Sequence, residues 1–167
     1  MAGLTKALTD PVITIGTMAE RTSLSVSAIR KYEAEGLLIP HRTPSGYRYF
    51  SYEDFERVKI IRHMIQDLGL NMEGIRRLHA LLPCWELAGC SSSKRKRCPA
   101  YHRDNSKPCW ISQGGNCSPT ANECRHCVVY RFGSQCTEDI KRLVYTRSGQ
   151  KDLNREVRKI LNDKRKQ

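Results

Sequence analysis

The chain has 167 residues, enough for one ordinary domain or two small ones. Its net charge of +12 and isoelectric point of about 9.5 indicate a polyanionic partner, and nucleic acid is the commonest one. The sequence has no apolar run of about 18 residues, which excludes a membrane-spanning helix. It also lacks the features of a secretory signal. We therefore expect a cytoplasmic protein, where clustered cysteines more often bind metal or do redox chemistry than form structural disulfides.

A first helix is predicted after a flexible leader over residues 1–12. Ordered structure is expected to begin at Ile13. The next apolar positions have the spacing of one helical face, namely Ile15, Met18 and Ala19. Residues 21–23 are predicted to end this helix as a short turn.

A second helix is predicted over residues 26–35. Ser25 is placed to cap its N-terminus with a hydroxyl oxygen, and Gly36 can take the left-handed conformation that ends a helix. Ala28, Ile29 and Tyr32 would face inward. Two short helices joined by a tight turn form a helix-turn-helix.

A β-hairpin is predicted over residues 41–50. Turn-forming residues at 44–46 are followed by aromatic residues that favour strands. The tip carries Arg42 and Arg48 near Tyr47. Cations beside hydrogen-bonding aromatic side chains suit contact with DNA phosphates.

Two further helices are predicted between residues 51 and 82. Residues 51–54 fit a capping box, Gly69 would end the first of these helices, and Asn71 would cap the second. His63 and His79 are assigned to the surface or to packing rather than to a ligand site. Apolar residues at near-helical spacing are assigned to the core: Phe55, Val58, Ile61, Met64, Ile65, Leu68, Ile75, Leu78, Leu81 and Leu82.

This order of elements resembles the MerR family of bacterial transcription regulators. The resemblance covers about 70 residues and rests on IGTMA at 15–19, SVSAIRKYEAEGLL at 25–38, SGYRY at 45–49 and YEDF at 52–55. It implies a homodimer that binds a pseudo-palindromic site in double-stranded promoter DNA and acts with RNA polymerase there, in the bacterial cytoplasm at the nucleoid. Activation and repression both occur in the family.

The resemblance also implies DNA-binding residues. Ser25, Ser27 and Arg30 would lie at or near the major groove, and Tyr32 would lie in the recognition helix, partly in the core. Tyr47 and Arg48 of the hairpin would hold phosphates, joined by Arg42. Lys31 stands where the family commonly has an aromatic residue, so it could meet a phosphate only as a point charge. Arg21 is a further phosphate contact by charge and position.

The composition changes abruptly after Leu82. Eight cysteines follow, at positions 84, 90, 98, 109, 117, 124, 127 and 136. Only Cys124 and Cys127 form a C-x₂-C pair, which can place two thiolates on one ion. The segment also has an internal echo, since Pro83-Cys84-Trp85 recurs as Pro108-Cys109-Trp110, and the two copies could form a pair of ligand loops. The segment resembles small bacterial modules named for two Cys-Trp dipeptides, a likeness that implies no particular cofactor.

Four interpretations of these cysteines stay open. They are a structural zinc site, an iron–sulfur cluster, a reversible disulfide switch and inert buried thiols. We place metal or cluster binding first, because eight thiols in so short a segment are too dense for inert packing. Cys124 and Cys127 are the first candidate ligands, followed by Cys98, Cys109 and Cys117, and then by Cys84, Cys90 and Cys136. His102 and His126 are expected to face solvent.

Two further segments are predicted, one basic and one helical. Residues 91–97 are predicted to be a mobile basic loop, which is either simply flexible or adds sequence-independent DNA affinity. Residues 137–167 are predicted to be a short helical tail that could pair two chains. The predicted fold is mainly α: a winged helix-turn-helix of four helices and a hairpin over 13–82, an irregular cysteine-rich domain over 83–136, and the tail.

We therefore predict a DNA-binding transcription regulator, not an enzyme, whose cysteine module holds zinc or an iron–sulfur cluster for sensing or structure. One alternative is a thiol–disulfide enzyme using the C-x₂-C pair, but no βαβ pattern surrounds it. Another is a module that recruits a partner protein.

Overall fold

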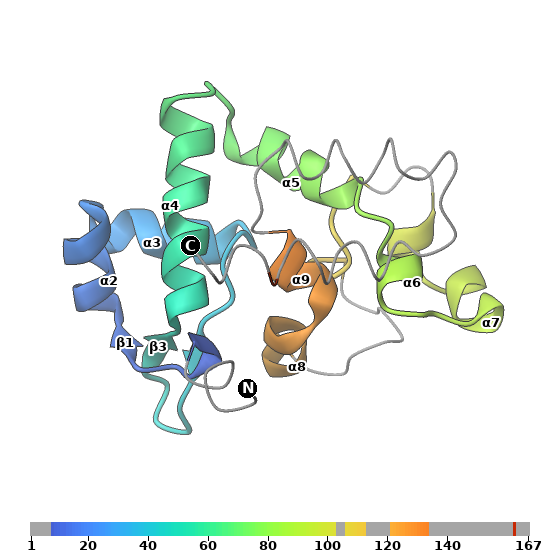
Figure 1. Ribbon diagram of the computed structural model, residues 1–167, viewed down its shortest axis with the longest axis horizontal. Coiled ribbons are helices and arrows are strands. Elements are labelled where there is room, and N and C mark those ends of the chain that lie inside the picture. The colour runs from blue at the N-terminus through green and yellow to red at the C-terminus, as the bar shows by residue number, and fades with distance from the viewer. Residues whose placement is uncertain (1–7, 103–105, 113–120, 134–161, 163–167) are drawn as a thin grey trace. The chain divides into compact units, whose positions relative to one another are not determined.

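The computed structural model describes residues 8–102, 106–112, 121–133 and 162. These residues fall into two compact units, one ending at Arg76 and the other beginning at Arg77 (Figure 1). The cysteine-rich segment belongs to the second unit. Within the described residues, no helix is both long enough and apolar enough to cross a bilayer. The leader up to residue 7 and the predicted tail, apart from Asn162, lie outside the described residues.

The first unit begins with a helix-turn-helix. Helix α2 (Ile15–Thr22) and helix α3 (Val26–Ala34) pack against each other and are joined by a turn at residues 23–25. The turn predicted at 21–23 is wrong, since α2 continues through Thr22 and only Ser23 leaves it, with φ of 53°. Thr22 stays helical because it is buried and its hydroxyl donates to the Met18 carbonyl at 2.7 Å.

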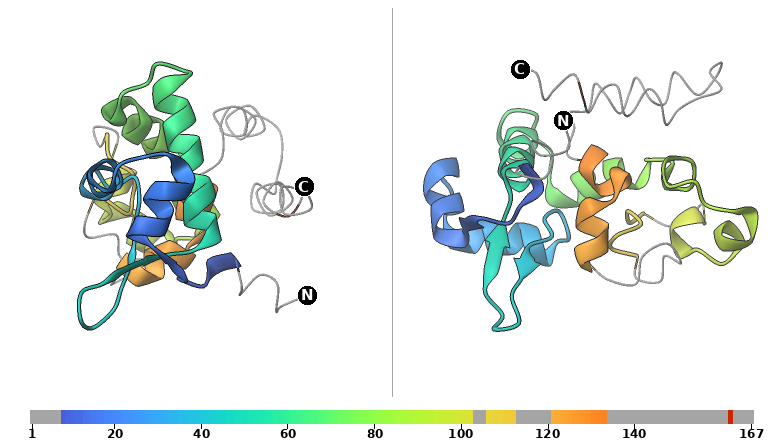
Figure 2. Two further views of the ribbon diagram at one scale, coloured as in Figure 1. Left: turned by 90° about the vertical axis from the view of Figure 1, so that its left-hand side faces the viewer. Right: turned by 60° about the horizontal axis from the view of Figure 1, so that its bottom comes forward.

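A small antiparallel sheet lies beside these helices. Strands β2 (His41–Arg42) and β3 (Arg48–Phe50) form the predicted hairpin, in which Arg42 pairs with Arg48. Strand β1 (Ile13–Thr14) adds to the other edge of β3, opposite Phe50 and Tyr49, and gives the order β1-β3-β2. The hairpin turn needs Gly46, whose φ is 84°. The views in Figure 2 show this hairpin extending from the first unit as a narrow loop.

Two longer helices complete the first unit. Helix α4 (Tyr52–Gln66) starts at the predicted capping box, in which the hydroxyl of Ser51 accepts from the Asp54 amide and the Asp54 carboxylate accepts from the Ser51 amide. Helix α5 (Met72–Ala80) starts at Asn71, whose side chain accepts from the Gly74 amide at 2.7 Å. The division between the two units falls within α5.

The core of the first unit gathers the buried faces of α2, α3, α4 and the sheet. It contains Ile13, Met18, Ala19, Ile29, Tyr32, Leu37, Leu38, Phe50, Val58, Ile61, Met64 and Ile75. Two predicted core positions are wrong: Leu68 is 47% exposed and Leu81 is 62% exposed. Both lie beyond the last residue of their helix, where the helical spacing no longer directs a side chain inward.

The second unit consists of short helices: α6 (Cys84–Leu87), α7 (Ser92–Lys96), the 3₁₀ turn η1 (Pro99–Tyr101), α8 (Ala121–His126) and α9 (Val128–Phe132). Its small apolar core contains Leu82, Leu87, Val129 and Phe132, with Trp110 packed against it. The predicted mobile loop at 91–97 is wrong, because most of it forms α7. Lys and Arg are good helix formers, and the Arg95 side chain ties this helix to the Cys90 carbonyl at 3.0 Å.

Candidate nucleic-acid interface and thiol cavity

Helix α3 has one buried face and one exposed polar face. Ile29 and Tyr32 are buried, while Ser25, Ser27, Arg30 and Lys31 are exposed. The Ser25 hydroxyl caps the helix by accepting from the Ala28 amide at 3.1 Å, and it lies 2.8 Å from the Ser27 hydroxyl. The exposed face therefore presents two hydroxyls and two cations from one rigid element.

Tyr32 belongs to the core rather than to this exposed face. Only 5% of its surface is accessible. Burial raises the pKa of its hydroxyl, and the nearby Arg62 opposes that effect. Its ring has little surface left for a base or a phosphate, so the expected DNA contact from Tyr32 does not fit its position.

The hairpin is joined to α3 by one carboxylate. The Nε atom of Arg48 donates to Glu33 Oε2 at 2.7 Å, and the guanidinium of Arg42 donates to Glu33 Oε1. A guanidinium has five N–H donors, so these ion pairs leave donors on both arginines for a phosphate. Glu33 therefore fixes two cations of the hairpin beside the exposed face of α3.

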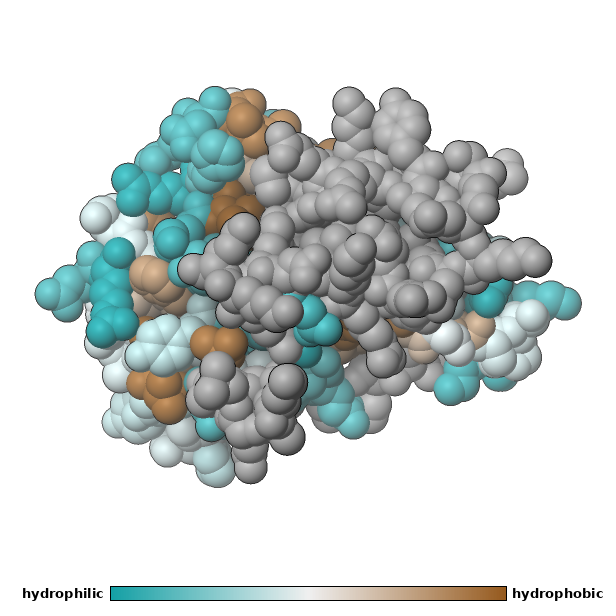
Figure 3. Space-filling view, viewed as in Figure 1, coloured by the Kyte–Doolittle hydropathy of each residue, from teal (hydrophilic) through white to brown (hydrophobic). Residues whose placement is uncertain are grey.

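Two other predicted contacts lie at the surface of the first unit. Tyr47 is 69% exposed at the hairpin turn, and Arg21 is exposed in the last turn of α2. On the face of this unit seen in Figure 3, the described residues show hydrophilic surface with separate apolar patches between. A surface of cations, hydroxyls and an exposed tyrosine provides donors for a phosphate backbone.

Sequence reasoning did not find Glu33. The residue lies inside the motif quoted for the family resemblance, but its partners are nine and fifteen positions away. No local spacing in the sequence links a helix residue with two hairpin residues. Arg42 and Arg48 show which charges need a partner, and only the fold shows which carboxylate they meet.

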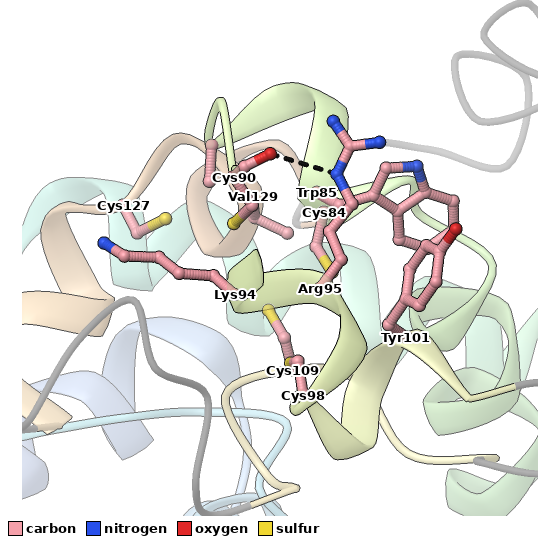
Figure 4. A pocket seen from close by; sticks show the side chains of 11 residues that line it. Cys84, Trp85, Cys90, Lys94, Arg95, Cys98, Tyr101, Cys109, Cys127 and Val129 are labelled. Atoms are coloured by element: carbon pink, nitrogen blue, oxygen red, sulfur yellow. Dashed lines mark hydrogen bonds between the residues drawn. The ribbon is translucent and has the colours of Figure 1, made fainter. Parts of the chain in front are cut away.

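In the second unit, five cysteines line a single cavity: Cys84, Cys90, Cys98, Cys109 and Cys127 (Figure 4). Lys94 and Arg95 of α7 also line this cavity. The remaining lining residues are Trp85, Ala88, Tyr101 and Val129. Thiols that are spread over 44 positions of the sequence, from 84 to 127, therefore meet in one place.

The two Pro-Cys-Trp copies form matching turns. The Pro83 carbonyl accepts from the amides of residues 86 and 87 at 3.0 and 3.1 Å. The Pro108 carbonyl accepts from the amides of residues 111 and 112 at 2.9 and 3.1 Å. Each turn carries its cysteine to the cavity. The internal echo in the sequence thus corresponds to two similar local structures.

The cysteines of the two Pro-Cys-Trp copies, Cys84 and Cys109, contact each other. A hydrogen bond from the Cys109 thiol lowers the pKa of the Cys84 thiol, because it stabilises the thiolate against the opposing effect of burial. Burial raises the pKa of Cys90, and the nearby Cys84 and Cys98 raise it further. Lys94 and Arg95 act on Cys90 in the opposite direction.

The C-x₂-C pair does not share the cavity. Cys127 lines it, but Cys124 is a half-buried residue of α8 that is absent from the lining. Cys117 and Cys136 lie outside the described residues. Among the His, Cys, Asp and Glu side chains that the structure describes, no three converge closely enough to hold one metal ion. His102 and His126 are exposed, as predicted.

Residues 13–81 match the family model described as MerR HTH family regulatory protein. This segment coincides with the helix-turn-helix, the hairpin, α4 and α5. The N-terminal part of the chain is therefore similar to MerR-type helix-turn-helix domains. The match ends before Cys84, so it says nothing of the cysteine cavity.

Several curated proteins resemble this part of the chain. It is 38% identical over 68 residues to the HTH-type transcriptional regulator GlnR of Bacillus anthracis, which covers 41% of this chain and 52% of that protein. It is 34% identical over 68 residues to the putative heat shock protein HspR of Streptomyces coelicolor, covering 41% of this chain and 45% of that protein. It is 35% identical over 81 residues to the HTH-type transcriptional regulator ZntR of Escherichia coli K12, covering 48% of this chain and 57% of that protein. The chain spans about half the length of the curated relatives it matches.

Proposed function

We propose that the protein is a transcription regulator that binds double-stranded promoter DNA through α3 and the β2–β3 hairpin. The observation that carries this proposal is the exposed face of α3, with Arg30, Lys31 and two serine hydroxyls, flanked by hairpin arginines that Glu33 holds in place. A recognition helix in the major groove with a hairpin on the backbone is a common arrangement of winged DNA readers. The net charge of +12 supports a polyanionic partner.

The active form in this proposal is a homodimer in the bacterial cytoplasm that acts with RNA polymerase at the promoter. Two helix-turn-helix heads related by two-fold symmetry would read two half-sites of a pseudo-palindrome. Support comes from the similarity of residues 13–81 to the MerR-type model. The tail predicted to pair two chains lies outside the described residues.

The cysteine-rich unit, in this proposal, holds zinc or an iron–sulfur cluster and couples its state to DNA binding. The gathering of five thiols around one cavity supports this role. Loss or oxidation of the centre would change how the heads bind DNA. If chelation or oxidation left DNA affinity and promoter activity unchanged, the centre would have only a structural role.

The DNA-binding part is tested by the variant Arg30→Ala/Arg48→Ala. Each substitution removes a cation from α3 or from the hairpin, so affinity for a duplex at fixed salt should fall at least about tenfold, which equals about 1.4 kcal/mol. Fluorescence anisotropy with a labelled duplex measures the change. Lys59→Ala is the control, because Lys59 is an exposed cation on α4 paired with Glu56. An equal loss in the control, or no loss in the double variant, would contradict the assignment.

A further inference from the structure

We propose that α7 of the second unit carries a second DNA contact, which binds the phosphate backbone of a duplex whatever its sequence. Three exposed cations form this contact, and we call them the α7 patch: Lys94, Lys96 and Arg97. The exposed serines at 91–93 precede them in the chain and add hydroxyl groups. This inference rests on the proposed function, because it adds a surface to the one that α3 and the hairpin provide. The match to the MerR-type model does not reach these residues.

The first support is the absence of partners for these cations. The first unit pairs four of its cations with carboxylates: Arg42, Arg48, Lys59 and Arg76. Within the described ranges, the side chains of the α7 patch form no hydrogen bond or ion pair. The same is true there of Arg30 and Lys31, the cations on the exposed face of α3. The fold therefore leaves cations available on α7 as it does on the proposed DNA-binding face.

The second support is the concentration of like charge. Residues 87–102 contain four lysines and arginines, at positions 94–97, and no carboxylate. Lys94 and Arg97 are three positions apart, a spacing at which like charges destabilise a helix. The preceding carboxylate in the chain belongs to Glu86, which accepts from Trp85 Nε1 at 3.2 Å. A bound polyanion would relieve the repulsion between these cations.

The third support is the fixed position of the patch. The side chain of Arg95 reaches back from α7 and donates to the Cys90 carbonyl at 3.0 Å (Figure 4). Figure 1 shows α7 at the edge of the second unit. Cations on an anchored helix lose less freedom on binding than cations of a flexible loop, so more of their attraction is expressed as affinity.

The composition of α7 favours DNA over a protein as the partner. The helix has the sequence SSKRK, with no apolar side chain, and none of its residues is buried. Protein interfaces are usually centred on apolar or aromatic side chains and are depleted in lysine. Contacts with a phosphate backbone need only cations and hydroxyls. Because both units belong to one chain, a duplex bound by the head is present at high effective concentration for α7.

The test measures the duplex affinity of the full chain as a function of salt concentration. The variant Lys96→Gln/Arg97→Gln removes two cations of the patch that do not line the cysteine cavity. Each phosphate contact contributes about 0.9 to the slope of log K against log salt. With a random-sequence duplex, the slope should therefore decrease by about 1–2, and the dissociation constant near ~0.1 M salt should rise about three- to tenfold. A slope equal to that of the wild type would overturn the proposal.

The matched control is Lys59→Gln/Lys107→Gln, which removes the same charge from two exposed cations outside the patch. Fluorescence anisotropy gives the salt slope of all three proteins, and the control should keep that of the wild type. An equal decrease in the control would mean that net charge rather than the α7 patch sets the affinity, and it would overturn the proposal. Loss of promoter activity in the α7 variant with an unchanged slope would assign the patch to a protein partner and would also overturn it.

A second readout uses the wild-type chain only, so it does not depend on the folding of a variant. Lysine acetylation, with and without a saturating random-sequence duplex, is followed residue by residue with mass spectrometry. The duplex should lower the labelling of Lys96 at least about threefold and leave that of Lys59 unchanged. Labelling of Lys96 that does not respond to the duplex would contradict the proposal.

Failure of this inference and failure of the proposed function give different results. A phosphate contact weakens binding to all sequences alike, so the α7 variant should keep the wild-type preference for a selected fragment over a random duplex. If Arg30→Ala/Arg48→Ala loses affinity and the α7 variant does not, only this inference fails. If the wild type shows no sequence preference while the α7 variant loses affinity, only the proposed function of the head fails.

Discussion

At the scale of single residues, Glu33 links the two parts of the candidate DNA interface. Its two carboxylate oxygens each accept from an arginine of the hairpin, Arg42 and Arg48. The side chain of Glu33 is only 16% exposed, so the pairs are less screened by water than ordinary surface ion pairs. We interpret Glu33 as a positioning residue that orients cations toward DNA without touching it.

The variant Glu33→Gln tests this interpretation. It keeps the size of the side chain but removes the charge that holds both arginines, so duplex affinity should fall about three- to tenfold through misplacement of the hairpin. The substitution also removes a negative charge, and that effect by itself would instead strengthen binding to DNA. Anisotropy titrations against the control Glu56→Gln, an exposed acid on α4, separate the two effects. Unchanged or tighter binding specific to Glu33→Gln would show that the ion pairs do not position the hairpin.

Two cysteines of the cavity should differ in their response to pH. The pKa of Cys84 is lowered by its hydrogen bond with Cys109, and the pKa of Cys90 is raised by burial. In the metal-free chain, the pH midpoint for iodoacetamide labelling should therefore be lower at Cys84 than at Cys90, because the thiolate is the reactive form. The variant Cys109→Ala should move the Cys84 midpoint upward. Equal midpoints at the two cysteines would show that the contact does not exist in solution.

Tyr32 shows what residue-level reasoning from sequence could not resolve. Its place on a recognition helix predicts a DNA contact, and its spacing from Ala28 and Ile29 predicts the core. The burial of its ring, 5% exposed, agrees with the second prediction. The sequence alone could not decide between them, because helical spacing does not show which neighbouring elements cover a residue at the edge of the buried face.

At the scale of elements, helix ends were predictable from local chemistry. Ser25, Ser51 and Asn71 cap the helices that follow them, as their side chains and positions indicated. The sequence did not predict β1, whose two residues form a strand only by pairing with β3. Helix α7 was also not predicted, because four adjacent cations repel one another. Their helix propensity and the hydrogen bond from the Arg95 side chain to the Cys90 carbonyl favour the helix despite that repulsion.

Ser51→Ala tests the capping box. The Ser51 side chain is buried and bonds to both the amide and the carboxylate of Asp54, so its loss should lower the free energy of unfolding by about 1–2 kcal/mol. Ser91→Ala is the control, because Ser91 precedes α7 without a capping hydrogen bond from its side chain. Urea unfolding followed by circular dichroism gives both values. Equal effects of the two substitutions would mean that the box adds nothing to the stability of the first unit.

At the scale of the whole molecule, the two units differ in how much the sequence predicts. The first unit follows from helical spacing, caps and a hairpin turn, all of which are local signals. The second unit depends on contacts between residues far apart, such as Cys84 with Cys109. The C-x₂-C motif drew attention to Cys124, while the cavity includes Cys84 and Cys90, which spacing ranked last. Irregular gaps between cysteines carry little information about which thiols meet.

The central claim is that the N-terminal unit recognises duplex DNA, and it is tested most directly by selection and footprinting with the full chain. Genomic duplex fragments are enriched on the purified protein, and nuclease protection is then mapped on the enriched fragments for the wild type and Arg30→Ala. We predict protected sites that share a two-fold symmetric sequence and that disappear in the variant. Equal retention of all fragments, or a footprint unchanged by Arg30→Ala, would contradict the claim.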